Sequence, residues 1–439
     1  MLSRSRAIWH GTIIPMYKRK AFWITSIFGI TTIINIATQL IIARFFGVSG
    51  SLDAFLLAVT LPTIFMTTMY ASVNDMFLPI YTKALQSKAK TAARIAGSWC
   101  KQLSLMGSIL TVIMVAAPWI VLLLLFGNDG VRGTQHLRIM APTFLLGLLN
   151  AQLMSMAYAK KHFLLPPLLQ LVGAGVNAAV VVFFGTSMGI YALSVGFLLN
   201  YTVQFILLLP YAQFDLSAPR VETNNLYKSW LPLIGAYILL RSDTWLLRFS
   251  STGLGEGAVS TVNYGARIMS LSAGIITSGI KVLLFPLLSE AAAKKNTVRF
   301  NALVVKGQIA AVVLGAIAVI FILLVARPLV ETFLVAGAFS SENGRAVLNL
   351  LPWFVPAALG WALFEVAAAP FLALGRQKIV ASVTGLSFVG SVVSTFILKP
   401  QLGILSAPIA VGLLVGVNTL VLGSIWYLFR QQLLKPKKS

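Results

Sequence analysis

A stripe of polar side chains runs along one apolar segment in the second half of the chain. Its members follow one another at alternating steps of four and three residues: Asn263, Arg267, Ser270, Gly274, Thr277 and Lys281. This spacing puts all of them on one face of a helix. The surrounding sequence is apolar and long enough to cross a bilayer. Charge at that depth is costly and usually faces a bundle interior or a water-filled cavity, so Arg267 and Lys281 are candidate substrate-binding residues.

A second apolar segment carries the same pattern. Each of its members lies 207 residues before a member of the first stripe: Thr60, Thr63, Thr67, Tyr70 and Asn74. At the same offset, Pro79 aligns with Pro286. The match predicts two halves repeated in the same orientation, as in transporters that bind substrate between their halves. We therefore add Asn263 and Asn74 to the candidate residues that line a cavity.

The composition indicates a polytopic membrane protein. Hydrophobic residues make up 58% of the 439 residues and charged residues only 10%, far below the roughly 25% of a soluble domain. The net charge of +23 does not indicate nucleic acid, because the basic residues fall in short loops between apolar runs. Lys and Arg at such positions set membrane orientation. We expect membrane lipids, and no nucleic acid, as partners.

Twelve apolar runs are long enough to be transmembrane helices. They lie near 22–44, 54–82, 103–126, 137–158, 163–185, 189–211, 228–249, 258–288, 304–326, 346–373, 379–398 and 404–428. Lys and Arg concentrate at both termini and in every second loop, which predicts an all-α protein with cytoplasmic termini and two six-helix lobes. The expected parts are a basic N-terminus (1–21), an N-lobe (22–211), a cytoplasmic loop (212–227), a C-lobe (228–428) and a basic tail (429–439).

After Lys228 at its start, the seventh run carries three charged side chains. Arg241 and Arg248 are seven residues apart, so they share a face of a continuous helix. Because the seventh and eighth runs cross in opposite directions, Arg241, Asp243 and Arg267 should lie at similar depth and form a cationic patch. Arginine suits phosphate, since its planar guanidinium donates two parallel hydrogen bonds. The alternative is a structural Arg–Asp pair that joins the two helices without a ligand.

Two further pairs are candidate gates. Lys281 and Glu365 both fall in the inward halves of their helices and are expected to pair, either as a gate or as a permanent structural contact. Asp53 begins the second run close to Arg44. An acidic residue there could pair with this arginine, or cap the helix and complement its dipole.

Enzyme motifs are absent from the sequence. The three histidines (His10, His136 and His162) are not clustered, no metal-ligand spacing occurs, and no glycine-rich phosphate loop or nucleotide-binding domain is present. We therefore expect a transporter rather than an enzyme, with no cofactor, no metal site and no ATP hydrolysis of its own. The driving force stays open between protons, sodium and the membrane potential.

Several motifs resemble a known family. The run Ala43-Arg-Phe-Phe-Gly-Val-Ser-Gly-Ser-Leu-Asp-Ala-Phe55 is followed by Phe77-Leu-Pro-Ile-Tyr81, and later by Val262-Asn-Tyr-Gly-Ala-Arg267, Phe285-Pro-Leu-Leu-Ser289 and Phe333-Leu-Val-Ala-Gly-Ala-Phe339. They are similar to the MurJ/MviN lipid II flippases of the multidrug/oligosaccharidyl-lipid/polysaccharide exporter superfamily. The Tyr264-Gly-Ala-Arg267 run after Asp243 is also similar to polysaccharide-repeat flippases of that superfamily.

The resemblance implies a two-lobed, alternating-access flippase of the bacterial cytoplasmic membrane. Its substrate would be an undecaprenyl-pyrophosphate-linked glycan, either lipid II or an exopolysaccharide repeat unit. By position, Arg267 would bind the pyrophosphate and Asp53 would belong to the outer gate. We expect the protein to act as a monomer.

The chain departs from the family pattern in its charges. Essential arginines of the first two spans are replaced by Thr32, Thr38 and Met66. The acidic residue three positions after the arginine of the eighth span is Ser270, and the family's usual spans 13 and 14 are not found. Arg241 and Lys281 are candidates to replace the lost charge, and a different lipid-linked glycan is an open alternative.

Two other functions are weighed against this one. A cation-coupled multidrug exporter would need buried carboxylates, for which Asp243 and Glu365 are the candidates. A membrane glycan polymerase or ligase would need a large outer loop with catalytic residues. The longest predicted outer loop has only about twenty residues, so this function ranks third.

Overall fold

The computed structural model describes the backbone of residues 2–216 and 224–433, and the side chains of residues 22–216, 230–273 and 284–432. The described residues are helical throughout, apart from turns and one isolated β-bridge between Ala336 and Phe339. The prediction of an all-helical protein is therefore confirmed.

Contacts within the chain group it into two compact units. The first consists of Met1–Phe45, Leu61–Leu122 and Val131–Gly235, and the second of Phe46–Thr60, Leu123–Gly130 and Ala236–Ser439. Three helices contribute more than one residue to each unit: α2 (Gly50–Ser87), α4 (Pro118–Phe126) and α10 (Asn224–Leu240). The first part of α2, up to Thr60, therefore belongs to the second unit, whereas the predicted N-lobe contains the whole helix.

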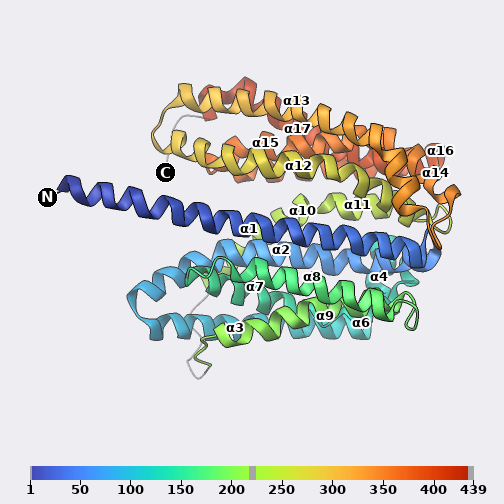
Figure 1. The fold of residues 1–439 in the computed structure, drawn as a ribbon, viewed down its shortest axis with the longest axis horizontal. Helices are drawn as coiled ribbons and strands as arrows, with labels where there is room; N and C mark the ends of the chain where they lie inside the picture. The colour runs from blue at the N-terminus through green and yellow to red at the C-terminus, as the bar shows by residue number, and fades with distance from the viewer. Residues whose placement is uncertain (1, 217–223, 434–439) are drawn as a thin grey trace. The chain divides into compact units, whose positions relative to one another are not determined.

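The first unit is built from antiparallel helices around an aromatic core. Its helices, besides those shared, are α1 (Leu2–Phe46), α3 (Ala89–Ala116), α6 (Thr134–Met140), α7 (Thr143–Ala159), α8 (Leu165–Phe184), α9 (Tyr191–Leu208) and the short η1 (Leu209–Tyr211). Helix α3 packs on α7, and α8 packs on α9 (Figure 1). In the core, the ring of Trp99 lies 5.4 Å from that of Phe77 and 5.8 Å from that of Trp230.

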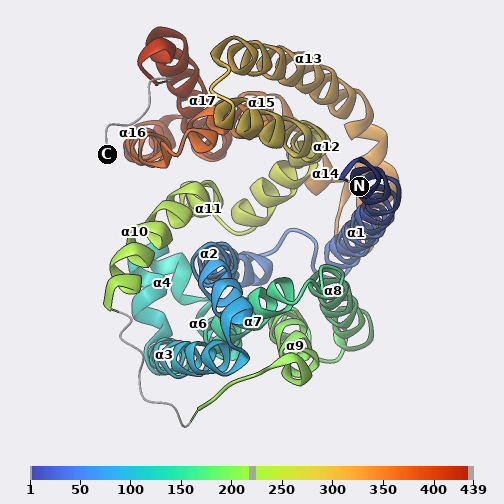
Figure 2. The same ribbon diagram turned by 90° about the vertical axis from the view of Figure 1, so that its left-hand side faces the viewer.

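The second unit packs long helices against α12 and α15. Its elements are α5 (Asn128–Val131), α11 (Ser242–Ser251), α12 (Ala258–Ala293), α13 (Thr297–Leu329), η2 (Val330–Leu334), α14 (Ser341–Leu350), η3 (Leu351–Phe354), α15 (Val355–Ala373), α16 (Gln377–Leu402), η4 (Gly403–Leu405) and α17 (Ser406–Leu433). Helix α15 contacts α12, α13 and α17, and α16 runs beside α17 (Figure 2). Trp426 joins Phe300 and Phe371 in the core, with ring distances of 5.5 and 6.0 Å.

Several predicted spans are interrupted. The third breaks at Ala117, directly before Pro118, and the fourth breaks at Ala141–Pro142, because proline lacks the amide hydrogen that a helix interior requires. The tenth passes through η3, which contains Pro352. The seventh breaks at Arg241, where no proline or glycine gives a signal. Residues 224–227, predicted as loop, form the first turn of α10, and residues 434–439 of the predicted tail lie outside the described residues.

Nine helical stretches among the described residues are long and apolar enough to cross a membrane. The last of them, Gln377–Gln432, covers two predicted spans, and the seventh and eighth predicted spans correspond to α10–α11 and α12. Each of the twelve predicted ranges thus contains helix. The number of crossings and the cytoplasmic position of both termini stay predictions.

Thiol labelling would test the topology. In a variant with Cys100 replaced by serine, we expect a cysteine at Lys88 to be protected from a membrane-impermeant reagent, and cysteines at Asn128 and Asn343 to react from outside. The expectation follows from the excess of Lys and Arg in the loop around Lys88. Labelling of the Lys88 site in intact cells would contradict the order of crossings.

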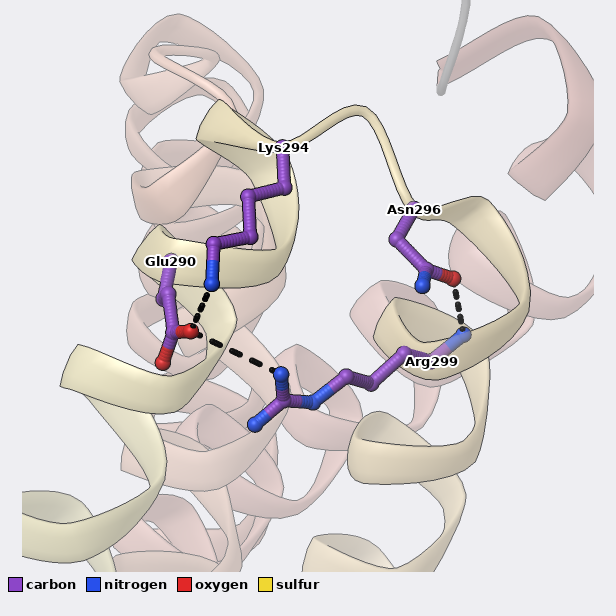
Figure 3. Close-up of polar contacts among 4 residues, drawn as sticks. All are labelled: Glu290, Lys294, Asn296 and Arg299. Carbon is purple, nitrogen blue, oxygen red and sulfur yellow. Dashed lines mark hydrogen bonds and ion pairs between the residues drawn. The ribbon is translucent and has the colours of Figure 1, made fainter.

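The turn between α12 and α13 gathers charges that this topology places in the cytoplasm. Glu290 lies 2.6 Å from Lys294 and 3.5 Å from Arg299 (Figure 3). The hydrogen bond from Lys294, together with the nearby positive charges, lowers the pKa of Glu290. Asn296 caps α13 by accepting the backbone N–H of Arg299 at 2.9 Å. These contacts fix the turn, but exposed ion pairs contribute little stability.

Candidate functional site

The connection between α1 and α2 makes a close approach within the second unit. Gly47 has a φ of +55°, a conformation that residues with a Cβ rarely adopt, and a Cβ there would meet the carbonyl oxygen of Ala338. The carbonyl of Gly47 also accepts the hydroxyl of Tyr264 at 3.2 Å. This turn therefore holds the start of α2 beside the start of α12.

Asp53 binds the N-terminus of a different helix from its own. Its two carboxylate oxygens accept the backbone N–H groups of Gly257 and Ser260, both at 2.7 Å, and the residue is buried. These amides belong to the first turn of α12, where the helix leaves its N–H groups without internal partners. We expected Asp53 to cap α2, its own helix, but it caps α12. The fold allows this because it brings the starts of the two helices together.

Arg44 does not take part in this contact. Its side chain is exposed near the end of α1, and no ion pair involving it occurs among the described residues. Both oxygens of Asp53 are occupied by backbone amides. The predicted Arg44–Asp53 pair is therefore not formed in this conformation.

Arg248 is a buried arginine that the sequence interpretation placed on the face of Arg241 but did not assign to the substrate. Its Nη1 donates to the carbonyl of Leu56 at 2.5 Å and to the hydroxyl of Thr60 at 2.7 Å. Only 6% of the residue is exposed. The available signal was its position between Leu247 and Phe249 in an apolar run, where a charge is costly unless it has a partner.

Arg267 is exposed on a helix whose outer half is otherwise mostly buried. Its neighbours Ala266 and Ile268 are buried, while Ser270, on the same stripe, is exposed and donates to the carbonyl of Arg267 at 2.8 Å. Arg267 makes no ion pair with any described residue. Asn263, one turn nearer the start of α12, is buried. The exposed part of the stripe among the described side chains thus begins at Arg267.

Asp243 lies in the first turn of α11, where a negative charge complements the helix dipole. Its carboxylate accepts Nε1–H of Trp361 at 3.0 Å, and the nearby charge of exposed Arg241 also stabilises it. The break at Arg241 separates this residue from the helix that carries Arg248. The predicted shared face of Arg241 and Arg248 is therefore wrong.

The charged residues fall into two groups rather than one patch. Arg241 acts on Asp243, whereas Arg267 lies close enough to Arg248 for the two positive charges to repel each other. No ion pair joins Arg267 to Asp243 within the described part of the chain. The alternative of an Arg267–Asp243 staple between the seventh and eighth spans is therefore not found.

The remaining candidates are placed less fully. Asn74 of α2 accepts the hydroxyl of Ser155 in α7 at 3.5 Å, within the first unit. Glu365 is half-buried on α15. The side chains of Lys281 and Thr277 lie outside the described residues, and so does the exposure of Gly274. The predicted Lys281–Glu365 pair therefore stays a prediction.

The fold is shared with solved structures of membrane proteins that are themselves described as flippases and transporters. A solved structure titled lipid II flippase MurJ, inward closed conformation, superposes with a TM-score of 0.80 at 17% identity, covering 92% of this chain and 87% of that one. An inward-facing multidrug resistance MATE transporter gives 0.77 at 16% identity, covering 93% and 96%. At these low sequence identities, the structural similarity shows only that the chains share a fold.

The family is shown by the sequence. The family described as lipid II flippase MurJ matches residues 42–439, so the chain belongs to it. A lipid II flippase MurJ of Burkholderia cenocepacia is 23% identical over 415 residues, which cover 90% of this chain and 80% of the relative. A probable lipid II flippase MurJ of Buchnera aphidicola is 22% identical over 378 residues, or 80% and 71%. The resemblance seen in the motifs is confirmed, and the chain is a multi-pass protein of the bacterial inner membrane.

Proposed function

We propose that this protein flips lipid II from the inner to the outer leaflet of the cytoplasmic membrane. The observation that carries the proposal is the family match over nearly the whole chain. A pyrophosphate-linked lipid also suits the site, because Arg267 offers an exposed guanidinium without a carboxylate partner among the described residues. Arginine binds phosphate oxygens through charge-assisted, often bidentate hydrogen bonds.

The mechanism we infer is alternating access by a monomer. In it, the glycan and pyrophosphate enter a polar cavity while the lipid tail stays in the membrane. The hydrogen bonds of Asp53 to the start of α12 would form one side of the outer gate and would break when that gate opens. Protons, sodium and the membrane potential remain the candidate driving forces.

An exopolysaccharide repeat unit is the second candidate substrate. It is favoured by the three positions where the family resemblance implies arginines. Thr38 and Met66 are buried, and the hydroxyls of Thr32 and Thr38 donate to carbonyls of their own helix. These residues cannot contribute positive charge to a cavity. Both candidate substrates contain the pyrophosphate and differ in the glycan. A changed set of cations is compatible with a changed glycan on the same pyrophosphate.

Transport in reconstituted vesicles would decide between the substrates. We expect vesicles containing the protein to move fluorescent lipid II between leaflets faster than protein-free vesicles, and faster than they move an undecaprenyl-pyrophosphate-linked exopolysaccharide unit. The preference would reverse if the repeat unit is the natural substrate. Movement of an organic cation, without movement of either lipid, would contradict the proposal and favour a multidrug exporter.

A further inference from the structure

The guanidinium of Arg248 is only partly used by the protein. Its Nη1 is held by Leu56 and Thr60, but Nε is buried and has no hydrogen-bond partner, and Nη2 donates to no described residue. Because the group is planar, fixing Nη1 on α2 turns the opposite Nε–Nη2 edge away from that helix. This edge carries two parallel N–H groups at the spacing of two oxygens of a phosphate.

A buried cation with an unfilled edge is costly. Only 6% of Arg248 is exposed, so its charge is largely removed from solvent. Among the described residues, no carboxylate lies within ion-pair distance of it. An uncompensated buried charge and an unsatisfied buried donor both destabilise a protein unless a ligand meets them. The energetic cost of burying Arg248 therefore favours binding of an anionic ligand, because the described part of the chain supplies no anion to this arginine.

A second arginine makes that partner more specific. Helix α11 packs on α12, and the charge of Arg267 acts on Arg248 as a like charge. Repulsion between two cations in a medium of low dielectric constant is relieved when an anion lies between them. Two arginines, one buried and one exposed, suit an anion with two linked charged groups better than one with a single group.

We propose that Arg248 is a second pyrophosphate-binding residue, which takes one phosphoryl group on its Nε–Nη2 edge while Arg267 takes the other. The inference rests on the proposed function and makes it more specific. It also assigns the replacement of the family's lost arginines to Arg248, and not to Arg241, whose charge serves Asp243. The backbone carbonyl of Leu56 is the positioning group, because it holds Nη1 of Arg248 whatever side chain stands at position 60.

The test compares two ligands that differ by one phosphate. Binding of a polyprenyl diphosphate and of the monophosphate with the same chain length is measured on the purified full-length protein. We expect wild type to prefer the diphosphate. Arg248→Met should weaken diphosphate binding about ten- to a hundredfold, the usual effect of losing a charge-assisted hydrogen bond, and leave monophosphate binding nearly unchanged.

Two matched variants separate binding from packing. Thr60→Val keeps the shape of the side chain and the charge of Arg248 but removes one hydrogen bond, so the diphosphate preference should persist. Arg327→Gln removes an exposed arginine whose Nε lies 3.4 Å from Glu331, and should change neither affinity. If Arg248→Met does not fold, Arg248→Lys serves instead, since lysine keeps the charge and loses the two-pronged geometry.

The outcomes distinguish this proposal from the proposed function. A wild-type protein that binds neither lipid would overturn both. A wild-type preference for diphosphate that survives in folded Arg248→Met, or in full strength in Arg248→Lys, would overturn the role of Arg248 alone. Thr60→Val could also lose the preference to the same extent as Arg248→Met. That result would contradict the proposal, because it would show that Arg248 acts only by packing α11 against α2.

Discussion

Replacing Arg267 by alanine is expected to abolish lipid II flipping while the protein still inserts into the membrane. Arg267 is exposed and makes no ion pair with a described residue, so its removal leaves no buried carboxylate stranded. The loss of one charged hydrogen-bond partner corresponds to roughly 1.5–3 kcal/mol, or about ten- to a hundredfold in substrate affinity. Translocation in reconstituted vesicles, normalised to the amount of inserted protein, measures the effect.

Two further variants separate pyrophosphate binding from a structural role. Arg267→Lys should recover flipping only in part, because an ammonium group cannot make the two parallel hydrogen bonds of a guanidinium. Adding Asp243→Asn to Arg267→Ala should not restore flipping, since Asp243 is held by Trp361 and not by Arg267. Recovery in that double variant would show that Arg267 had served only to neutralise Asp243.

The positions of the helices could be predicted because each apolar run is long enough to satisfy its own backbone in a membrane. Interruptions at Pro118 and Pro142 also carry a sequence signal. The break at Arg241 does not. Directly after this break, Asp243 accepts a hydrogen bond from Trp361 of α15, a partner 118 residues away in the chain. Such long-range contacts cannot be recognised from local sequence.

The sequence predicted which residues belong to the candidate site better than it predicted which of them contact one another. Spacing alone identified the stripe that contains Arg267, and it indicated that Asp53 stands at a helix start. It could not show that Asp53 caps α12 instead of α2, because the two starts meet only after the chain has folded. Arg248 was missed for a related reason. Its acceptors, Leu56 and Thr60, lie nearly two hundred residues earlier.

Replacing Asp53 by alanine is expected to release the first turns of α2 from α12. The change removes a buried acceptor from the N–H groups of Gly257 and Ser260, each in a charge-assisted bond of about 1.5–3 kcal/mol. Asp53→Asn should have an intermediate effect, because only one of its two side-chain ends can accept a hydrogen bond. The reactivity of a cysteine introduced at buried Val259, with Cys100 replaced by serine, reports the release.

We expect this reactivity toward a small hydrophilic thiol reagent to rise at least about tenfold in Asp53→Ala, since 1.4 kcal/mol already corresponds to a factor of ten in an opening equilibrium. Glu342→Ala is the matched control. Glu342 also lies in the first turn of a helix, α14, but it is exposed, so its loss affects only a dipole interaction of about 0.3–1 kcal/mol. Equal reactivity in the two variants would mean that Gly47 and its contacts, and not Asp53, hold the start of α2 in place.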